Sequence, residues 1–245
     1  MTSETSRQSC VVACAILLAA LAATSAAAGR SAQPVRLLVV TGGHGYPTSF
    51  YTLFEQPDLV WDHATSNEEA FKGDLRAKYD VLVLYDMSQT LTDAGRKHFQ
   101  AFVETGKGLV VLHHAIVSYH DWPWYHELIG AHYWERPRGN TPASTYKHDE
   151  YVDVREVGAH PVTAAVAPVR LFDETYKGMW WSPRIRVLLT TDNPTSDGPL
   201  AWIAPHPRSR IVTVQLGHGA ETHRHVAYRT LVRNAILWSV GRLSD

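Results

Sequence analysis

Runs of apolar residues alternate with polar, helix-like stretches along the first half of the chain. The most continuous apolar runs lie at residues 35–41, 59–63, 81–85 and 109–112. Between the last two runs, Thr92 is a typical helix N-cap and Gly106 a typical stop. Phe99, Phe102 and Val103 would share one face of the helix between them. Apolar strands that alternate with helices are typical of a parallel sheet covered on both sides. The pattern predicts a doubly wound, mostly parallel α/β fold with helices on both faces.

The second half is less regular but keeps the same two kinds of element. Residues 146–154 alternate as a strand does, and residues 122–128 suggest a short, aromatic-rich helix. Its rings either line the same cleft as the candidate site or fill the core, and we favour the core. Further strands are predicted at residues 169–172, 187–191, 200–204 and 211–216. A last helix over residues 226–240 would carry an apolar stripe of Leu231, Ala235 and Trp238. Because the sequence shows no internal repeat, one domain over residues 35–241 is the simplest organisation.

Residues 1–28 have the features of a secretory signal peptide. An apolar core at residues 11–23 follows a weakly basic start, and the alanines at 26–28 suit cleavage. A membrane-spanning helix needs about 20 apolar residues, so we expect no stable membrane anchor after cleavage. The mature protein would be periplasmic or extracellular. Both cysteines, Cys10 and Cys14, lie in this segment, so the mature protein would have no thiol nucleophile and no thiolate metal ligand.

Composition and charge exclude several functional classes. The 245-residue chain is 45% hydrophobic and carries 23 basic and 24 acidic residues, a formal net charge of −1. Proteins that bind nucleic acid or anionic membranes need a basic excess to displace counterions. We therefore expect a globular protein whose partner is a small molecule and not a nucleic acid, with a homo-oligomer as a possible assembly.

The chain contains 14 histidines, and three of them directly follow predicted strands. His44 follows the first strand in a glycine-rich turn, His113 follows the fourth, and His218 follows the strand that ends at residue 216. Ligands of open parallel sheets bind outside the carboxyl ends of the strands, so these side chains should meet at one edge. A lone histidine is more often satisfied by the backbone, but three at one edge favour function. Imidazole transfers protons near neutrality and, when neutral, binds metals. We predict a site of His44, His113 and His218 that holds a divalent metal such as zinc or acts in proton transfer, with His114 pointing away.

Two further clusters have the composition of a sugar site, because aromatic rings stack on sugar faces while carboxylates bind hydroxyls. One lies at residues 146–150, and the other at residues 173–178 has tryptophans close behind it. For each cluster the alternative is a solvated charged loop. The candidate substrate-binding residues are Tyr46, His148, Asp149, Tyr176 and Trp180. Glu174 is the candidate catalytic carboxyl group.

These motifs, in this order, resemble the ThuA-like family, which is named for trehalose utilisation and belongs to the class I glutamine amidotransferase-like superfamily. The matching segments are residues 39–45, 79–83, 106–115, 146–149, 160–163, 173–176 and 216–219. The resemblance implies a flavodoxin-like fold and a role in carbohydrate metabolism. Amidotransferases of this superfamily use a cysteine at the turn that His113 occupies and a histidine at the position of His218. With the thiol absent, we expect no glutaminase activity.

The resemblance also implies a substrate class. In sugar-utilisation pathways the family accompanies dehydrogenases that make 3-keto-glycosides, and a 3-keto group acidifies the neighbouring C2–H. We therefore expect an exported lyase or hydrolase that acts on an oxidised glycoside, with His113, His218 and Glu174 as catalytic residues. One alternative is a non-catalytic sugar-binding protein that uses the same cleft. Another is a metal-dependent hydrolase of unrelated small molecules.

Overall fold

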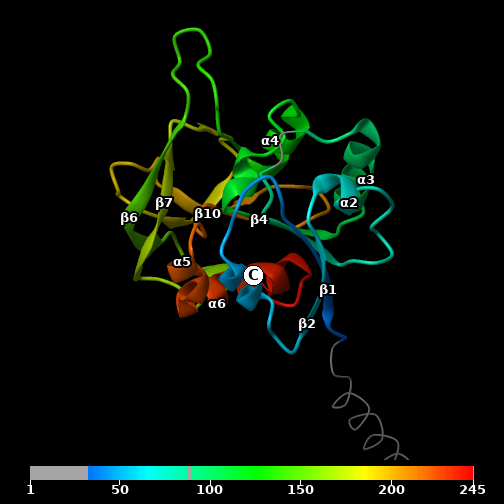
Figure 1. Ribbon diagram of the computed structural model, residues 1–245. Helices are drawn as coiled ribbons and strands as arrows, with labels where there is room; N and C mark the ends of the chain where they lie inside the picture. Colours follow the sequence, from blue (N-terminus) through cyan, green and yellow to red (C-terminus); the bar gives the residue numbers. More distant parts are fainter. Residues whose placement is uncertain (1–32, 88–89, 245) are drawn as a thin grey trace, which may run out of the picture. The chain divides into compact units, whose positions relative to one another are not determined.

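The computed structural model describes residues 33–87 and 90–244, and Val35–Asp245 form one compact unit (Figure 1). The predicted signal peptide, with both cysteines, lies outside the described residues. Within the described residues, every helix is too short or too polar to cross a membrane.

A nine-stranded sheet forms the centre of the unit. Its strands, in spatial order, are β2 (Leu59–Ala64), β1 (Val35–Val40), β3 (Val81–Leu84), β4 (Gly108–Leu112), β11 (Ile211–Val214), β10 (Pro199–Ala204), β9 (Arg186–Thr190), β6 (Thr145–Glu156) and β7 (Val169–Lys177). The first five strands are mutually parallel, and the remaining pairings are antiparallel. Only β10 and β6 therefore run against the other seven strands of this sheet. A separate ribbon pairs β5 (Ala131–His132) with β8 (Trp180–Trp181). The expected α/β, mostly parallel sheet is confirmed.

Helices cover both faces of the sheet, as a doubly wound fold requires (Figure 1). On one side lie α5 (Ala220–Arg224), α6 (Val226–Ser239) and the 3₁₀ turns η1 (Thr48–Leu53) and η3 (Pro161–Thr163). On the other lie α2 (Asn67–Ala70), α3 (Asp93–Glu104), α4 (Pro123–Ile129) and the 3₁₀ turn η2 (His113–Val117). Alternate residues of β1 divide between the two sides, because successive side chains of a strand point to opposite faces. Leu37 packs in the cluster that contains Leu231 of α6, and Leu38 in the cluster that contains Phe99 of α3.

Local sequence signals account for the helix boundaries. The Thr92 hydroxyl accepts a hydrogen bond from the Gly95 N–H at 3.1 Å and caps α3. Gly106, just beyond the helix, has a positive φ of 85°, which suits glycine at a helix end. The predicted start, apolar face and stop of α3 are confirmed. Trp122 and Tyr125 are buried beside α3, so these rings fill the core, as expected.

Candidate functional site

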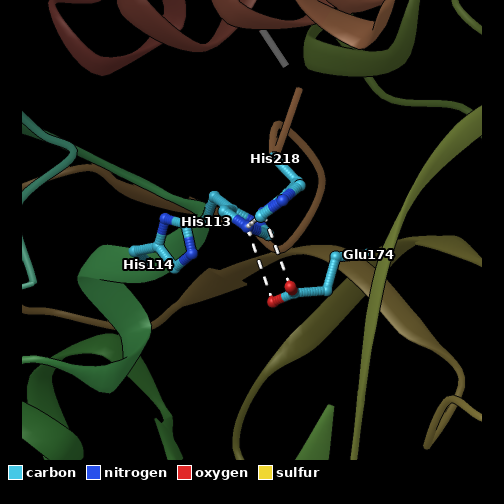
Figure 2. A group of neighbouring side chains, drawn as sticks. All are labelled: His113, His114, Glu174 and His218. Atoms are coloured by element: carbon cyan, nitrogen blue, oxygen red, sulfur yellow. Dashed lines mark hydrogen bonds and ion pairs between the residues drawn. The ribbon is translucent and has the colours of Figure 1, made fainter. Parts of the chain in front are cut away.

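The carboxyl ends of several strands assemble a cluster of titratable side chains. His113 is the first residue after β4, and His218 follows β11. The parallel pairing of Val214 with Leu112 places these two strand ends side by side. Glu174 lies near the carboxyl end of β7, and Figure 2 shows it beneath the two histidines. Because β6 runs in the opposite direction, its amino-terminal half brings His148 to the same edge.

His113 is completely buried, and its orientation is defined by hydrogen bonds. Its backbone has a φ of 47°, a left-handed conformation that is uncommon outside glycine. Nδ1 lies 2.6 Å from the carbonyl oxygen of Gln215. Because a carbonyl only accepts, Nδ1 carries the proton and Nε2 is the free acceptor. Nε2 lies 3.2 Å from Nδ1 of His218 and 3.7 Å from Oε1 of Glu174. Burial holds the pKa of His113 well below its usual range, so the ring is neutral.

The carboxyl group of Glu174 lies among three imidazoles. Oε2 is 2.6 Å from Nδ1 of His148 and 3.4 Å from Nδ1 of His218, and Oε1 faces His113. Tyr176, two residues further along β7, lies on the same strand face and hydrogen-bonds to the carboxyl group. Burial raises the pKa of Glu174 to about 7. A buried carboxyl group with such a pKa, surrounded by ring nitrogens, is typical of an acid–base or ligand-binding centre.

His114 also belongs to the cluster, which corrects the expectation that it points away. The 3₁₀ turn η2 that begins at His113 keeps the two adjacent rings together, with centroids 4.1 Å apart. The ring of His218 lies 5.4 Å from that of His114. Burial, followed by the neighbouring His44, lowers the pKa of His114 to about 2. In the described part of the chain its Nδ1 is buried with no hydrogen-bond partner, so a polar group is available for a ligand.

The donor set fits a divalent cation. One ligand atom from each of His113, His114, Glu174 and His218 lies within 4.8 Å of the others. Figure 2 shows these four side chains gathered at the carboxyl ends of the strands. Neutral imidazoles and a carboxylate are common ligands of zinc. The carbonyl of Gln215 holds Nδ1 of His113, and such an outer hydrogen bond is the usual way in which a metal-binding histidine is oriented.

His44 differs from the prediction that placed it among the metal ligands. Its ring is near the cluster, 4.2 Å from that of His114, but Nε2 lies 2.9 Å from the carbonyl oxygen of Tyr85 and Nδ1 lies 3.1 Å from that of Gly45. The metal-compatible group found in residues 33–87 and 90–244 does not include it. The physical reason is the glycine-rich turn after β1, which turns the His44 ring towards the backbone that follows β3.

Asp173 supports the site from the other face of β7. Its carboxyl oxygens accept backbone N–H groups of Glu174 at 2.8 Å, Gly217 at 2.8 Å and His218 at 2.9 Å. One buried side chain therefore joins β7 to the turn after β11. These bonds fix the backbone of His218 relative to Glu174.

The carbonyl oxygen of Gly217 is held equally firmly. It accepts the hydroxyl of Tyr85 at 2.7 Å and Nε2–H of His223 at 2.8 Å. Nδ1 of His223 then accepts the hydroxyl of Ser49 at 3.1 Å. Gly217 has a φ of 122°, and a Cβ there would lie 2.1 Å from the hydroxyl oxygen of Tyr228. The turn that carries His218 is therefore rigid and requires glycine.

A cavity of about 470 Å³ opens beside the cluster. Its lining residues are Met87, His114, Val117, Tyr133, Glu135, Arg136, Tyr146, His148, Glu174 and Tyr176. A mixture of aromatic rings and a few polar groups, at this volume, is typical of a small-molecule site.

The structure brings only two of the predicted substrate-binding residues, His148 and Tyr176, to this cavity. The hydroxyl of Tyr46 instead bonds to those of Thr41 and Tyr51. Trp180 lines a different cavity on the ribbon β5–β8. Asp149 is exposed and does not line the cavity.

A β-bulge in β6 explains why His148 and Asp149 differ. Lys147 pairs with Thr175 and Glu150 with Asp173, so β6 has one residue more than β7 over this stretch. Asp149 takes a φ of 59° and leaves the regular alternation. Bulges re-aim side chains and often occur next to active sites. Here the bulge accompanies the direct contact of His148 with Glu174.

Several lining residues carry no recognisable sequence signal. Tyr133, Glu135 and Arg136 lie in the connection between β5 and β6, which has no motif. Tyr146 belongs to the cluster at residues 146–150 and could have been chosen from its position. His114 is adjacent to a predicted ligand, but the direction of its ring depends on the 3₁₀ turn.

Comparisons with known proteins agree with this fold. The family model described as "ThuA: Trehalose utilisation" matches residues 36–239. A ThuA-like protein from Parabacteroides merdae is 19% identical, with a TM-score of 0.74 over 86% of this chain and 91% of that one. A second, from Bacteroides uniformis, is 20% identical, with a TM-score of 0.63 over 88% and 95%. The fold also matches, with a TM-score of 0.58 and 12% identity, 31% of a β-galactosidase from Rahnella sp. R3, over 84% of this chain.

At these identities the solved structures establish a shared fold and no activity. The comparison with curated protein sequences gives no match. The family model, by contrast, spans nearly all of the unit that carries the sheet and the histidine cluster. The family is associated with carbohydrate utilisation in a broad sense. The chain therefore belongs to the ThuA family, within the class I glutamine amidotransferase-like superfamily.

Proposed function

We propose that this protein is an exported lyase or hydrolase that cleaves an oxidised, 3-keto glycoside. One observation carries the proposal: the buried carboxyl group of Glu174 forms part of the cavity wall and lies beside ring nitrogens of His113, His148 and His218. Membership of a family concerned with sugar utilisation supports a carbohydrate as the substrate. The features of residues 1–28 support export.

The chemistry of a 3-keto glycoside matches these groups. A base removes the proton from C2, the electrons of that bond form a C1=C2 double bond, and the C1–O glycosidic bond breaks. The departing oxygen takes up a proton, and addition of water across the double bond completes a hydrolysis. Glu174 is positioned to accept the C2 proton, because its carboxyl group faces the cavity.

His148 is positioned to supply the proton for the departing oxygen. Its Nδ1 donates to Glu174 at 2.6 Å, and the side chain is 47% exposed on the cavity wall. On the buried side of the Glu174 carboxyl group, Nδ1 of His218 lies 3.4 Å from Oε2, and the unprotonated Nε2 of His113 faces Oε1. Proton transfer by a positioned side chain typically accelerates such a step by about 10²–10⁴-fold.

The test is an NMR time course of the purified protein with a 3-keto-disaccharide and with its unoxidised parent. We expect cleavage of the keto form alone. Glu174→Gln keeps the shape of the side chain and should abolish turnover, whereas Glu68→Gln, an exposed change on α2, should not. Cleavage of both sugars, or full activity of Glu174→Gln, would contradict the proposal.

A second candidate is a metal-dependent hydrolase, which the spacing of His113, His114, Glu174 and His218 favours. A divalent cation held there would act as a Lewis acid or lower the pKa of a bound water. Elemental analysis of the purified protein would show about one zinc or manganese per chain. Removal by a chelator should then abolish turnover, and the added metal should restore it. Full turnover by metal-free protein excludes this candidate.

A non-catalytic sugar-binding protein remains the contrasting hypothesis. It predicts calorimetric binding of the disaccharide that survives Glu174→Gln, with no conversion of either sugar by the wild-type protein. The same NMR samples decide between the two, because any release of the second sugar unit requires catalysis.

A further inference from the structure

A second cavity, of about 440 Å³, lies at the ribbon formed by β5 and β8. Its lining residues are His120, Pro123, His126, Glu127, His132, Trp134, Arg138 and Trp180. The chain that follows β5 forms a wall shared with the first cavity. Tyr133 and Glu135 line the first cavity, and His132 and Trp134 line the second. Over residues 132–135 this division follows the alternation of side chains along an extended segment, and Arg136, at the bend that follows, lines the first cavity.

One wall of the second cavity is a column of stacked planar groups. The ring centroids of His126 and His132 are 3.5 Å apart, and those of His132 and Trp134 are 3.6 Å apart. The guanidinium of Arg138 lies over the ring of Trp134. Because the faces of His132 and Trp134 are covered, their edges, which carry the ring nitrogens, are the parts left to meet a ligand.

Trp180 provides a different kind of surface. It pairs with His132 across the ribbon and is half-buried at the cavity. Among residues 33–87 and 90–244, no aromatic ring or cation is stacked on its indole. An unstacked indole beside ring N–H groups is suited to a ligand with an apolar face and a polar edge.

The charges around this cavity balance. The lining includes one arginine, Arg138, and one carboxylate, Glu127, which pairs with Arg184 at 3.5 Å. His120 lies 2.8 Å from the carboxylate of Glu135. Burial lowers the pKa of His126 to about 4 and that of His132 to about 3, so both rings are neutral near pH 7. A phosphate or carboxylate ligand would require a cationic excess, which this cavity lacks. Its many hydrogen-bonding groups favour a neutral ligand that is rich in hydroxyls.

We propose that the second cavity binds a pyranose ring of a neutral carbohydrate, which stacks on Trp180 and hydrogen-bonds to Arg138, Glu127 and the edge of Trp134. The choice of a carbohydrate rests on the proposed function, but the site does not require turnover at Glu174. The protein then has two sugar-binding positions on either side of the segment that follows β5. Trp180 is a binding residue of this second position and not of the first.

Isothermal titration of the purified protein with trehalose and with methyl α-D-glucopyranoside tests the proposal. We expect two binding sites per chain in the wild type. Trp180→Ala should weaken one of them at least ten-fold, and Arg138→Ala, an exposed change that leaves the core intact, should weaken the same one. Trp61→Ala is the matched control, because this tryptophan is 36% exposed on β2 and should leave both sites unchanged.

Glu174→Gln separates this proposal from the proposed function, since it should abolish turnover and leave the Trp180-dependent site intact. Two results would overturn the second site. One is wild-type stoichiometry and affinity in both Trp180→Ala and Arg138→Ala. The other is the absence of binding of either sugar to the wild-type protein outside the first cavity. Absence of turnover in the wild-type protein, with Trp180-dependent binding retained, would overturn only the assignment of the reaction.

Discussion

Individual residues with uncommon surroundings create the site. His113 combines complete burial with a left-handed backbone, and its Nδ1–H is held by Gln215. Asp149, also left-handed, accompanies the bulge beside His148. Asp173 satisfies three backbone N–H groups with one carboxyl group. Each of these three features restricts the backbone locally. The first two accompany an imidazole that faces Glu174, and the third fixes the backbone at Glu174 and His218.

Asp173→Asn tests this support at the scale of one side chain. An amide has a single acceptor oxygen, so at least one of the three buried N–H groups would lose its partner. A buried unsatisfied donor costs about 1–3 kcal/mol. We expect the free energy of unfolding, measured by urea denaturation, to fall by about that amount.

The matched control is Asp153→Asn. Asp153 forms an exposed ion pair with Arg170 at 2.7 Å, and exposed pairs contribute about 0–1 kcal/mol. Equal stability of Asp173→Asn and the wild type would show that the three hydrogen bonds do not hold the turn after β11.

At the scale of elements, short turns at strand ends decide where the histidines lie. The parallel pairing of β4 with β11 sets the distance between the two turns that carry His113 and His218. The turn after β11 is held by Tyr85 and His223 through the carbonyl of Gly217. The antiparallel strands β6 and β7 then supply the carboxyl group and a further imidazole. A change in any of these connections should move the cluster apart while leaving the sheet intact.

Gly217→Ala is the sharpest change of this kind. The new Cβ would lie 2.1 Å from the hydroxyl oxygen of Tyr228, at a φ of 122°, so both a steric clash and backbone strain oppose it. Strain of this type costs about 1–3 kcal/mol. We expect a lower melting temperature by circular dichroism together with loss of turnover.

Gly219→Ala serves as the control, because φ there is −128° and no described atom lies within 4 Å of the added Cβ. It should behave like the wild type. A Gly217→Ala protein with unchanged melting temperature and activity would refute the requirement for glycine.

At the scale of the whole molecule, many titratable groups are buried in a neutral form. The pKa of His126 is lowered to about 4, that of His132 to about 3 and that of His223 to about 4, in each case chiefly by burial. Their unfolded values are about 6.5. Between these limits the unfolded chain binds more protons than the native one, so stability must fall as the pH decreases.

We therefore expect acid to destabilise the fold from about pH 6.5 downwards. Each proton taken up only on unfolding contributes a slope of up to about 1.4 kcal/mol per pH unit, reduced where solvent screens the group. Glu174 acts in the opposite sense, because its raised pKa of about 7 makes the native state the better proton acceptor between pH 7 and its unfolded value. Asp173, whose pKa is also raised by burial, acts in the same sense as Glu174. The buried histidines with lowered pKa values outnumber these two carboxyl groups and outweigh them. Melting temperatures measured from pH 7.5 to pH 4.5 should fall, and a flat profile would contradict this account.

The fold and part of the site follow from local chemistry that the sequence carries. Apolar runs at residues 81–85 and 109–112 form strands because both faces of the sheet are covered. Thr92 starts α3 because its hydroxyl caps a free N–H. Since parallel strands end at the same edge of a sheet, the proximity of His113 and His218 was predictable from their positions after strands. Glu174 could be chosen from its place beside aromatic residues.

Tertiary structure alone decided the rest. The inclusion of His114, the exclusion of His44 and the aim of His148 depend on a 3₁₀ turn, a glycine turn and a bulge, whose geometry arises from packing and not from residue type. Tyr133 and Trp134 line different cavities because neighbouring side chains of an extended segment point to opposite sides. Trp180 lines the same cavity as Trp134 because β8 pairs with β5. The sequence determined the layers of the fold and the strand ends, because periodicity and capping act over a few residues. The three-dimensional arrangement determined which side chains meet, because distances between remote segments are set only when the whole core packs.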